Sequence, residues 1–411
     1  MRTILISAYA CEPLKGSEQG VGWNWVLQLA KNNYIHVITR ANNQIPIEAH
    51  LPKELAENIT FHYYDTNNFI KGLKNKAKGL YFYYFFWQLG LIPLIMRLQK
   101  KEKFDYSMHL TMGSIWMPTF LPFFKVPFIW GPVGGGEGIP KTFLSSLPIK
   151  QRVVQTLRYF LKYLNYLNPL FLYTCFKAYS IITRTNNTLE FIPRTFRYKS
   201  KIFLETSMED EIFRIQKNTH SSNEMRLVTT GRLVAFKNVI TIIRALQFIP
   251  ETHKIKLTII GSGIEKERIC NEIVKAKISN KINFIEETTR EDVLSILSKS
   301  DIYLFPSLRE GGSWALMEAM AIGLPVICLN WSGMEIITNE QSAIRLPISD
   351  PDQMPKDMAD AICKLIDNPK LREQMGNAAR ERIKNVFNWD AKGVFMEKLF
   401  KDLDTTRQLK A

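Results

Sequence analysis

Paired cysteines are missing from this sequence. The five cysteines are odd in number, lie far apart and form no C-x-x-C motif: Cys11, Cys175, Cys270, Cys328 and Cys363. This pattern excludes a disulfide framework and a cysteine-based zinc site, and it indicates a reducing compartment. No cluster of histidines and cysteines suggests another metal, so we expect no metal and no other cofactor.

Acidic residues are scarce in the first half of the chain. Residues 1–204 contain 25 Lys and Arg but only 10 Asp and Glu, whereas residues 205–411 contain 29 of each. Lys71–Phe104 and Lys141–Lys177 hold most of the basic excess and are rich in aromatic residues and leucine. A one-sided basic surface suits an anionic partner, either nucleic acid or an anionic membrane. Since no zinc-finger or RNP-like signature is present, we expect no nucleic acid and favour an anionic membrane surface.

One apolar stretch, Tyr81–Trp87 followed by Leu89–Met96, resembles a membrane-surface helix with basic flanks. A transmembrane helix is a weaker interpretation, because Lys78 and Arg97 bracket only 18 positions. A pair of buried helices with a solvated basic rim is the third interpretation. Residues 3–10 are too short an apolar run for a secretory signal and predict a first β-strand.

At 411 residues the chain is too long for one ordinary core, which predicts two domains. The apolar content of 46% is that of a folded globular protein. We expect an N-terminal Rossmann-like domain over residues 1–204, a linker over 205–224 and a second Rossmann-like domain over 225–385. A C-terminal helix over 386–411 is expected to return toward the N-terminal domain.

Short apolar segments alternate with helical patterns in both halves. The strands expected in the first half are Thr3–Ala8, Ile35–Thr39, Ile59–Tyr64, Phe104–His109, Pro127–Trp130 and Ala178–Arg184. Those expected in the second half are Met225–Thr229, Lys256–Ile260, Ile282–Ile285, Ile302–Phe305 and Pro325–Leu329. A loop over Cys11–Gly22 is expected before a helix over Trp23–Lys31. The alternation predicts an α/β protein of two doubly wound parallel domains that face one another across a cleft.

The segment Glu310–Pro325 reads EGGSWALMEAMAIGLP and follows the expected strand Ile302–Phe305. Ligands of parallel α/β sheets bind where strands end. Gly311 and Gly312 let backbone amides approach a ligand, and Ser313 is a plausible N-cap. The helix start therefore favours an anion such as a phosphate.

Two carboxylates, Glu310 and Glu318, flank this anion site. Carboxylates repel phosphate but accept hydrogen bonds from sugar or ribose hydroxyls. Gly231–Arg232 ends another expected strand, and Lys237 follows five residues later, so two cations reach the same edge and suit a diphosphate. Taken alone, the segment Glu310–Glu318 is also compatible with an ordinary capped helix that carries a solvated glutamate. Arg232 and Lys237, taken alone, are also compatible with surface cations at a helix start.

Together the motifs resemble glycosyltransferase family 4, a family of retaining enzymes within the glycosyl transferases group 1 that have the GT-B fold. The E-x7-E element of that family matches Glu310 and Glu318, and its G-R-L…K element matches Gly231–Lys237. The further matching segments are Gly261–Ser262–Gly263, Pro306–Ser307 and Glu318–Val326.

The resemblance implies transfer of a sugar from a nucleotide-diphosphate sugar to a saccharide or lipid-linked saccharide acceptor. Such transfer serves O-antigen, capsule or exopolysaccharide synthesis. Arg232 and Lys237 would neutralise the diphosphate, Glu318 would bind the ribose, and Glu310 would hold the transferred sugar, without a metal. The full set expected to bind the donor is Gly20, Gly231, Arg232, Lys237, Gly261, Gly263, Glu310, Gly311, Gly312, Ser313, Trp314, Ala315 and Glu318.

The resemblance implies that residues 225–385 bind the nucleotide sugar and that residues 1–204 face the acceptor and the membrane, so the acceptor side is expected in the first half. Gly16–Gly20 resembles the family's Gly-rich loop, and Trp130–Glu137 (WGPVGGGE) stands where many relatives carry a histidine. We therefore expect His109 or Glu137 to serve the acceptor, with His109 in the catalytic set beside Glu310, Arg232 and Lys237. The structural alternative for His109 is a strand-end histidine that is hydrogen-bonded to the backbone. The structural alternative for Glu137 is a solvated side chain in a Gly-rich turn.

The resemblance also implies a cytoplasmic protein that is peripheral on the inner face of the cell membrane. Two other function classes stay open on the sequence. One is a different GT-B enzyme, such as a sugar-nucleotide epimerase, which would use the same diphosphate geometry without an acceptor. The other is a non-catalytic membrane-associated partner.

Overall fold

The computed structural model describes residues 1–73, 79–218 and 224–409, which form two compact α/β units. Unit 1 comprises residues 1–136, 161–205 and 389–411, and unit 2 comprises residues 137–160 and 206–388. Each unit is a doubly wound parallel sheet, which confirms the predicted fold class.

The units differ from the expected domain limits in two places. Residues 137–160 cluster with unit 2, although the expected N-terminal domain ran to residue 204, and residues 206–218 of the expected linker also cluster with unit 2. Residues 389–411, which belong to the helix expected to return toward the N-terminal domain, cluster with unit 1. The linker residues 219–223 lie outside the described part of the chain.

The sheet of unit 1 has the order β3-β2-β1-β4-β5-β6-β7, with every neighbouring pair parallel. Its strands are β1 (Thr3–Ser7), β2 (Tyr34–Arg40), β3 (Ile59–Tyr64), β4 (Tyr106–His109), β5 (Phe128–Val133), β6 (Ala178–Thr183) and β7 (Ser200–Ile202). The order reverses between β1 and β4, which are hydrogen-bonded neighbours.

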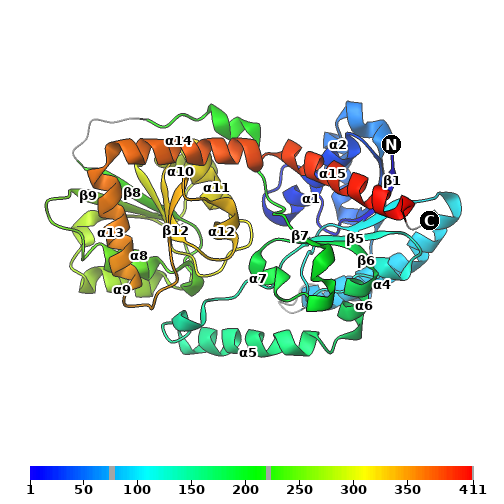
Figure 1. The fold of residues 1–411 in the computed structure, drawn as a ribbon, viewed down its shortest axis with the longest axis horizontal. Helices are drawn as coiled ribbons and strands as arrows, with labels where there is room; N and C mark the ends of the chain where they lie inside the picture. Colours follow the sequence, from blue (N-terminus) through cyan, green and yellow to red (C-terminus); the bar gives the residue numbers. More distant parts are fainter. Residues whose placement is uncertain (74–78, 219–223, 410–411) are drawn as a thin grey trace. The chain divides into compact units, whose positions relative to one another are not determined.

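Helices cover both faces of this sheet. The helices of unit 1 are α1 (Ser17–Ala30), α2 (Gln44–His50), α3 (Asn68–Leu73), α4 (Gly79–Lys101), α6 (Pro169–Lys177), α7 (Asn186–Leu189) and α15 (Trp389–Gln408), and α5 (Ile149–Asn165) runs across the boundary at residue 160. Figure 1 shows α1, α2 and α15 above the sheet of unit 1 and α4 and α6 below it. Because α1 begins at Ser17, the expected loop over Cys11–Gly22 is wrong in its second half.

Unit 2 repeats the pattern, with the order β10-β9-β8-β11-β12-β13 and parallel neighbours. Its strands are β8 (Met225–Thr230), β9 (Ile255–Ile260), β10 (Ile282–Ile285), β11 (Ile302–Phe305), β12 (Val326–Leu329) and β13 (Ala343–Leu346). Its helices are α8 (Val239–Ala245), α9 (Lys266–Lys275), α10 (Arg290–Ser298), α11 (Trp314–Ile322), α12 (Gly333–Ile337), α13 (Met354–Asp367) and α14 (Pro369–Val386). Within this unit, α10 and α14 lie above the sheet and α8 and α9 below it (Figure 1).

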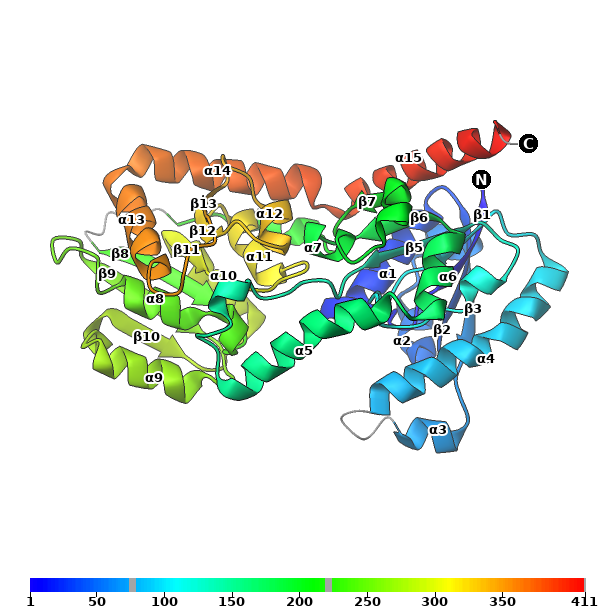
Figure 2. The same ribbon diagram turned by 60° about the horizontal axis from the view of Figure 1, so that its bottom comes forward.

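Helix α4 is the one helix of the described residues that is long and apolar enough to cross a membrane. It nevertheless packs one face into the core of unit 1, where Tyr83, Tyr84, Trp87 and Leu91 are buried. Figure 2 shows α4 beside the sheet, on the same side as α6. A helix whose buried face belongs to a sheet core cannot give that face to lipid, so the spanning interpretation loses its support.

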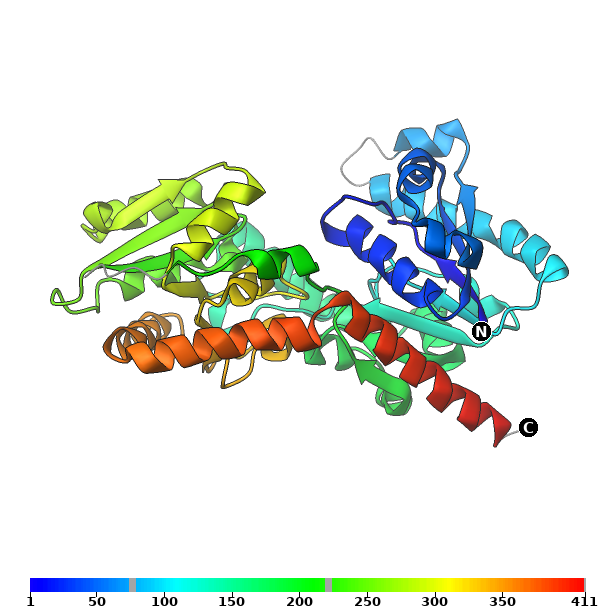
Figure 3. The ribbon, with the colours of Figure 1, turned by 90° about the horizontal axis from the view of Figure 1, so that it is seen from above.

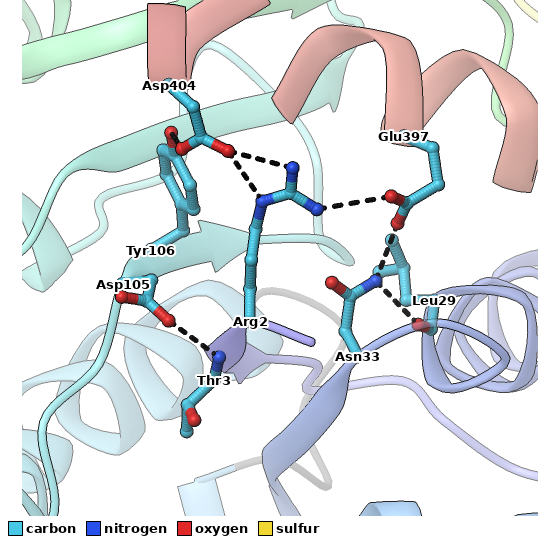
Figure 4. A network of polar contacts seen from close by, with 8 residues as sticks. All are labelled: Arg2, Thr3, Leu29, Asn33, Asp105, Tyr106, Glu397 and Asp404. Carbon is cyan, nitrogen blue, oxygen red and sulfur yellow. Dashed lines mark hydrogen bonds and ion pairs between the residues drawn. The ribbon is translucent and has the colours of Figure 1, made fainter. Parts of the chain in front are cut away.

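The C-terminal helix α15 is tied to the first strand of the same unit. Figure 3 shows α15 in red passing the N-terminal end of β1. Arg2 donates from Nε to Asp404 at 2.9 Å and from Nη1 to Glu397 at 3.1 Å, and its guanidinium lies 5.2 Å from the ring centre of Phe400 (Figure 4). Tyr106 also donates its hydroxyl to Asp404 at 2.6 Å. Residues from both ends of the chain therefore share one polar network.

Candidate functional site

The candidate site of unit 2 lies where its strand order reverses. Strands β8 and β11 are parallel neighbours, and their following connections run to opposite sides of the strand order. In open α/β sheets, such a reversal leaves a crevice at the carboxyl ends of the two strands. The loop after β8 carries Gly231, Arg232 and Lys237, and the loop after β11 carries Glu310–Ser313.

These two loops meet at an ion pair. Lys237 Nζ lies 2.5 Å from Glu310 Oε1, and Ser307 donates its hydroxyl to the same carboxylate oxygen at 2.8 Å. Lys237 Nζ also lies 4.8 Å from the ring centre of Phe305, the last residue of β11. The side chains of Lys237 and Glu310 are only 15% and 12% exposed, so both charges are held in a partly dehydrated crevice. The structure thus brings together two residues that are 73 positions apart in the sequence and that the motifs paired.

Glycines allow the β8 and β9 loops to pack backbone against backbone. Gly261 has a φ of +145°, and a Cβ on it would overlap the carbonyl oxygen of Gly231. Gly263 has a φ of +154°, and a Cβ there would overlap the carbonyl oxygen of Leu233. Leu233 N donates to Ser262 O at 2.8 Å, which closes the pair of loops. The predicted G-x-G therefore shapes the crevice wall.

A helix N-terminus completes this wall. Ser313 caps α11, because its hydroxyl accepts a hydrogen bond from Leu316 N at 3.4 Å, and the predicted N-cap is confirmed. The amides of Trp314 and Ala315 occupy first-turn positions that have no intrahelical acceptor. Together with the helix dipole they favour an anion at this end of α11.

The two glycines before the cap are constrained by packing. A Cβ on Gly312 would overlap the side chain of Thr206, and a Cβ on Gly333 would overlap the carbonyl oxygen of Gly311. Ser332 donates its hydroxyl to Glu310 O at 2.6 Å, and Gly333 N donates to the same oxygen at 3.0 Å. The segment after β12 therefore fixes the backbone that presents Glu310.

Glu318 lies further along α11 and is engaged by a residue that the motifs did not include. Arg290, the first residue of α10, donates from Nε to Glu318 Oε1 at 3.0 Å. The side chain of Glu318 is 13% exposed, and burial raises the pKa of its carboxyl, while Arg290 opposes that rise. Arg290 is visible in the sequence only as the residue after the cap Thr289, so nothing local signals its contact with Glu318.

Arginines add positive charge around Glu310. The side chain of Arg232 is exposed beside the crevice, in the loop after β8. Arg309 precedes Glu310 and was not predicted, and its guanidinium lies 4.3 Å from the ring centre of Phe236. Burial and the nearby charge of Arg158 lower the pKa of Arg309 to about 10. Its position directly before Glu310 is the sequence signal that could have identified it.

The residues predicted for the acceptor side lie in different parts of the structure. His109 ends β4 in unit 1, is 1% exposed, and has its Nε2 3.4 Å from the hydroxyl of Tyr84. Burial lowers the pKa of His109 to about 4, so its imidazole is neutral near pH 7. Gly20 lies inside α1, where a Cβ would overlap Lys15 O, and Glu137 is buried in unit 2. Unit 2 therefore collects the donor-type residues, whereas His109 and Gly20 belong to unit 1.

No group of three or more His, Cys, Asp or Glu side chains that could hold a metal ion is found within residues 1–73, 79–218 and 224–409. What the crevice does offer is two kinds of recognition. Lys237, Arg232 and the α11 N-terminus suit a diphosphate, and the carboxylates of Glu310 and Glu318 accept hydrogen bonds from hydroxyls. Phosphates linked to hydroxyl-bearing rings combine these two needs.

Comparison with known proteins agrees with this chemistry. Residues 210–382 match the model of the family "Glycosyl transferases group 1". The region matched runs from before β8 into α14 and contains Glu310, Glu318, Arg232 and Lys237.

Among curated relatives, the chain is similar to an uncharacterised glycosyltransferase of Methanocaldococcus jannaschii, with 31% identity over 185 residues, 44% of this chain and 46% of the relative. It is also similar to a GDP-mannose-dependent monoacylated alpha-(1-6)-phosphatidylinositol monomannoside mannosyltransferase of Corynebacterium glutamicum, with 24% identity over 47% of this chain and 51% of the relative. The chain thus matches about half the length of these relatives.

Among solved structures, a glycosyltransferase of Rickettsia africae is similar with a TM-score of 0.60 and 16% identity, over 98% of both chains. Since the likeness covers both units, it shows the fold of the whole chain. The fold is GT-B, built from two Rossmann-like domains.

Proposed function

We propose that this protein is a retaining glycosyltransferase that moves a sugar from a nucleotide-diphosphate sugar to a saccharide or lipid-linked saccharide acceptor. The observation that carries the proposal is the contact between Lys237 and Glu310 at the strand reversal of unit 2. The match of residues 210–382 to group 1 glycosyl transferases supports it, as does similarity to a relative whose name states GDP-mannose dependence. From the resemblance to glycosyltransferase family 4, we assign this transfer to cell-surface polysaccharide synthesis.

Lys237 and Glu310 match the two groups on either side of the bond that would break, the phosphate and the sugar. In a nucleotide-diphosphate sugar, the anomeric carbon is joined directly to the β-phosphate, so a cation for the phosphate and an acceptor for the sugar hydroxyls must be neighbours. Lys237 and Glu310 lie 2.5 Å apart and meet this requirement. We assign Lys237 and Arg232 to the diphosphate, whose charge grows as the sugar leaves, and Glu310 to the transferred sugar.

The remaining donor groups are assigned by the order of residues along α11. The α11 N-terminus, with Trp314 and Ala315, takes the phosphates, and Glu318 takes the ribose hydroxyls from the next turn of the helix. The cations and amides supply the positive field without a metal, so we propose a metal-independent reaction. His109 and Glu137 are proposed for the acceptor side.

A panel of nucleotide sugars tests the donor assignment. We expect calorimetry to show tight binding of one nucleotide sugar, and we expect Lys237→Met to weaken that binding at least about tenfold because a phosphate loses its cation. Glu310→Gln should bind the nucleotide but lower kcat at least about a hundredfold. Lys254→Met is the control, because Lys254 is exposed and directly precedes β9, at the end of the strands opposite to the crevice.

Three outcomes would contradict the proposal. Full transfer activity in Lys237→Met or Glu310→Gln would remove the site assignment. Conversion of the donor sugar in the absence of any acceptor would identify an epimerase. A failure to bind any nucleotide sugar would support a non-catalytic role. The anomeric configuration of the product, measured by NMR, tests retention.

We further propose that the protein is cytoplasmic and binds the inner face of the cell membrane. Helix α4 exposes an apolar face opposite its buried one, formed by Tyr81, Phe82, Phe85, Phe86, Leu89 and Met96. Helix α5 exposes Val153, Leu157, Phe160 and Leu164 along one helical stripe, and residues 141–177 contain no acid. Apolar side chains beside Lys and Arg suit an anionic lipid surface.

Vesicle flotation tests this membrane assignment. We expect the protein to float with phosphatidylglycerol vesicles at low salt, and the double variant Phe82→Ser/Phe86→Ser to bind them at least about tenfold less well. The matched control is Ile264→Ser/Val274→Ser, since these apolar side chains are 78% and 69% exposed on unit 2. Equal loss in both variants, or no binding of the parent protein at low salt, would reject the assignment.

A further inference from the structure

Unit 1 contains a cavity of about 270 Å³ between helices α4 and α6 and the segment after β4. For comparison, a dry apolar cavity of roughly 150 Å³ accommodates benzene. The cavity therefore has room for a flexible chain of several carbon atoms. Its wall is formed by Phe85, Ile115, Trp116, Met117, Pro118, Trp130, Asn168, Leu170, Phe171 and Thr174.

Most of the side chains in the wall are aromatic or aliphatic. Trp130 packs edge-on against Phe171, with ring centres 5.9 Å apart, and Phe85 packs edge-on against Phe120 at 6.0 Å. None of the lining residues carries a charge. An anionic head group placed inside would be dehydrated without a cation, so the cavity favours an apolar occupant.

The few polar groups of the wall are almost all engaged. Asn168 Oδ1 accepts from Leu170 N and Phe171 N, and Thr174 donates its hydroxyl to Leu170 O at 2.8 Å. A saccharide needs many donors and acceptors for its hydroxyls, and the side chains of this wall offer few that are not already engaged.

One buried donor is left over. Trp130 is 1% exposed, and its Nε1 has no hydrogen-bond partner in the part of the chain that the structure describes. A buried N–H without an acceptor costs free energy, so a single polar atom or a water bound with the occupant would complete this site. An apolar body with one oxygen nearby matches the wall better than a sugar does.

The cavity adjoins the exposed apolar face of α4. Phe85 lines the cavity and is itself 40% exposed, and Phe86 and Leu89 are exposed on the same helix. Phe123 lies 4.7 Å, ring centre to ring centre, from Tyr173 of α6, and it is 54% exposed. The cavity is therefore continuous with exposed aromatic and aliphatic side chains of α4.

We propose that this cavity binds the apolar chain of the lipid-linked acceptor. The inference rests on the proposed function, because it gives the acceptor's lipid part a place in unit 1. The basic excess of residues 1–204 complements the phosphate that joins such a chain to its saccharide. The head group remains outside the cavity, where Lys177 of α6, whose Nζ lies 5.7 Å from the ring centre of Tyr173, supplies a cation.

The test uses farnesyl monophosphate as the chain probe and inorganic phosphate as the chainless control. Binding is followed by calorimetry and by the fluorescence of Trp116 and Trp130, which line the cavity. We expect farnesyl monophosphate to bind at least about a hundredfold more tightly than phosphate, because each buried methylene contributes roughly fourfold in affinity. Equal affinities would overturn the proposal.

A matched pair of variants locates the binding. Leu170→Trp places a larger side chain in the wall and fills part of the cavity. Leu167→Trp introduces the same indole at a position that does not line the cavity and whose side chain is 77% exposed. We expect Leu170→Trp to weaken farnesyl monophosphate binding at least about tenfold, while Leu167→Trp leaves it unchanged. Circular dichroism melts establish whether both variants are folded. If Leu170→Trp does not fold, Phe171→Ala, which enlarges the cavity, replaces it as the test variant.

Further results distinguish a failure of the cavity proposal from a failure of the proposed function. Nucleotide-sugar binding by Leu170→Trp should equal that of the parent protein, so the proposed donor site can fail or hold independently. Unchanged farnesyl monophosphate binding in Leu170→Trp would overturn the cavity assignment. Quenching of tryptophan fluorescence by brominated phosphatidylglycerol that farnesyl monophosphate cannot reverse would assign the cavity to a membrane acyl chain instead.

Discussion

Single side chains decide the chemistry that this protein can offer. The predicted pair Glu310 and Lys237 is in contact, and Ser313 caps its helix as expected. Glu310 and Ser313 were predictable because each sits beside a glycine, and Lys237 because it follows the Gly231–Arg232 motif at a strand end. Arg290 was missed because its contact with Glu318 joins two helices that are separate in the sequence. Ser307 and Arg309 lie within three residues of Glu310, so the sequence did contain a local signal for them.

His109 is the residue for which burial has the clearest consequence. The pKa of its imidazole is about 4 in the folded protein and near 6.5 when unfolded. Between these values the unfolded chain binds a proton that the folded chain does not, so stability falls as the pH drops. We expect the unfolding free energy to be about 2 kcal/mol lower near pH 5 than near pH 7 on account of this residue alone.

Urea unfolding of His109→Gln at the two pH values measures that contribution. The variant should lose part of the pH dependence, whatever its stability near pH 7. His36 and His62 also have lowered pKa values because of burial, so a residual dependence of the same sign is expected. His50→Gln is the control, since His50 is exposed. An unchanged slope in His109→Gln would show that His109 is accessible to protons when folded.

Among the elements, three strands were predicted residue for residue. Ile59–Tyr64, Ile282–Ile285 and Ile302–Phe305 match β3, β10 and β11, because each is a short run rich in isoleucine and aromatic residues, which favour strands. The edge strands β7 and β13 were missed. β7 has three residues and no fully buried side chain, and β13 has four residues with the half-buried Ile344 and Arg345 in its middle, so neither presents an apolar run.

The loops after β8 and β9 give an element-scale prediction. Gly261→Ala would drive a Cβ into the backbone of Gly231 at a φ of +145°. We expect a loss of stability of about 1–3 kcal/mol and weaker nucleotide-sugar binding, because the two loops must separate. Gly16→Ala is the matched control, since no atom lies within 4 Å of its Cβ position.

Calorimetric binding and urea unfolding of both variants check this. If Gly261→Ala binds nucleotide sugars as the parent does, the packing of the two loops does not shape the donor crevice. A stability loss in Gly16→Ala equal to that of Gly261→Ala would show that the cost is general to glycine replacement.

At the scale of the whole molecule, the division of the chain was only partly readable from the sequence. The C-terminal helix was expected to return toward the N-terminal domain, and residues 389–411 cluster with unit 1. Composition places a boundary near residue 204, but residues 137–160, which include the first part of α5, cluster with unit 2. The unit that a helix joins depends on contacts between residues far apart in the chain, such as Arg2 with Asp404.

The polar network of Figure 4 gives the prediction at this scale. Arg2→Ala removes two carboxylate contacts from a side chain that is only 20% exposed, and we expect unfolding free energy to fall by about 1–2 kcal/mol. Lys31→Ala is the control, because Lys31 and Asp390 form an ion pair with exposures of 46% and 77% and should contribute about 0.5 kcal/mol or less. Equal losses in urea unfolding would mean that the network adds nothing beyond a surface ion pair.

The return of α15 to unit 1 has a consequence for synthesis on the ribosome. The chain begins unit 1, builds most of unit 2, and only then supplies Met396, Leu399 and Phe400 to the first unit. Residues 206–388 can therefore collapse while the earlier-made sheet still lacks one of its covering helices. We expect nascent chains arrested before residue 389 to expose an apolar patch beside α1, which makes the first-made unit the last to be completed.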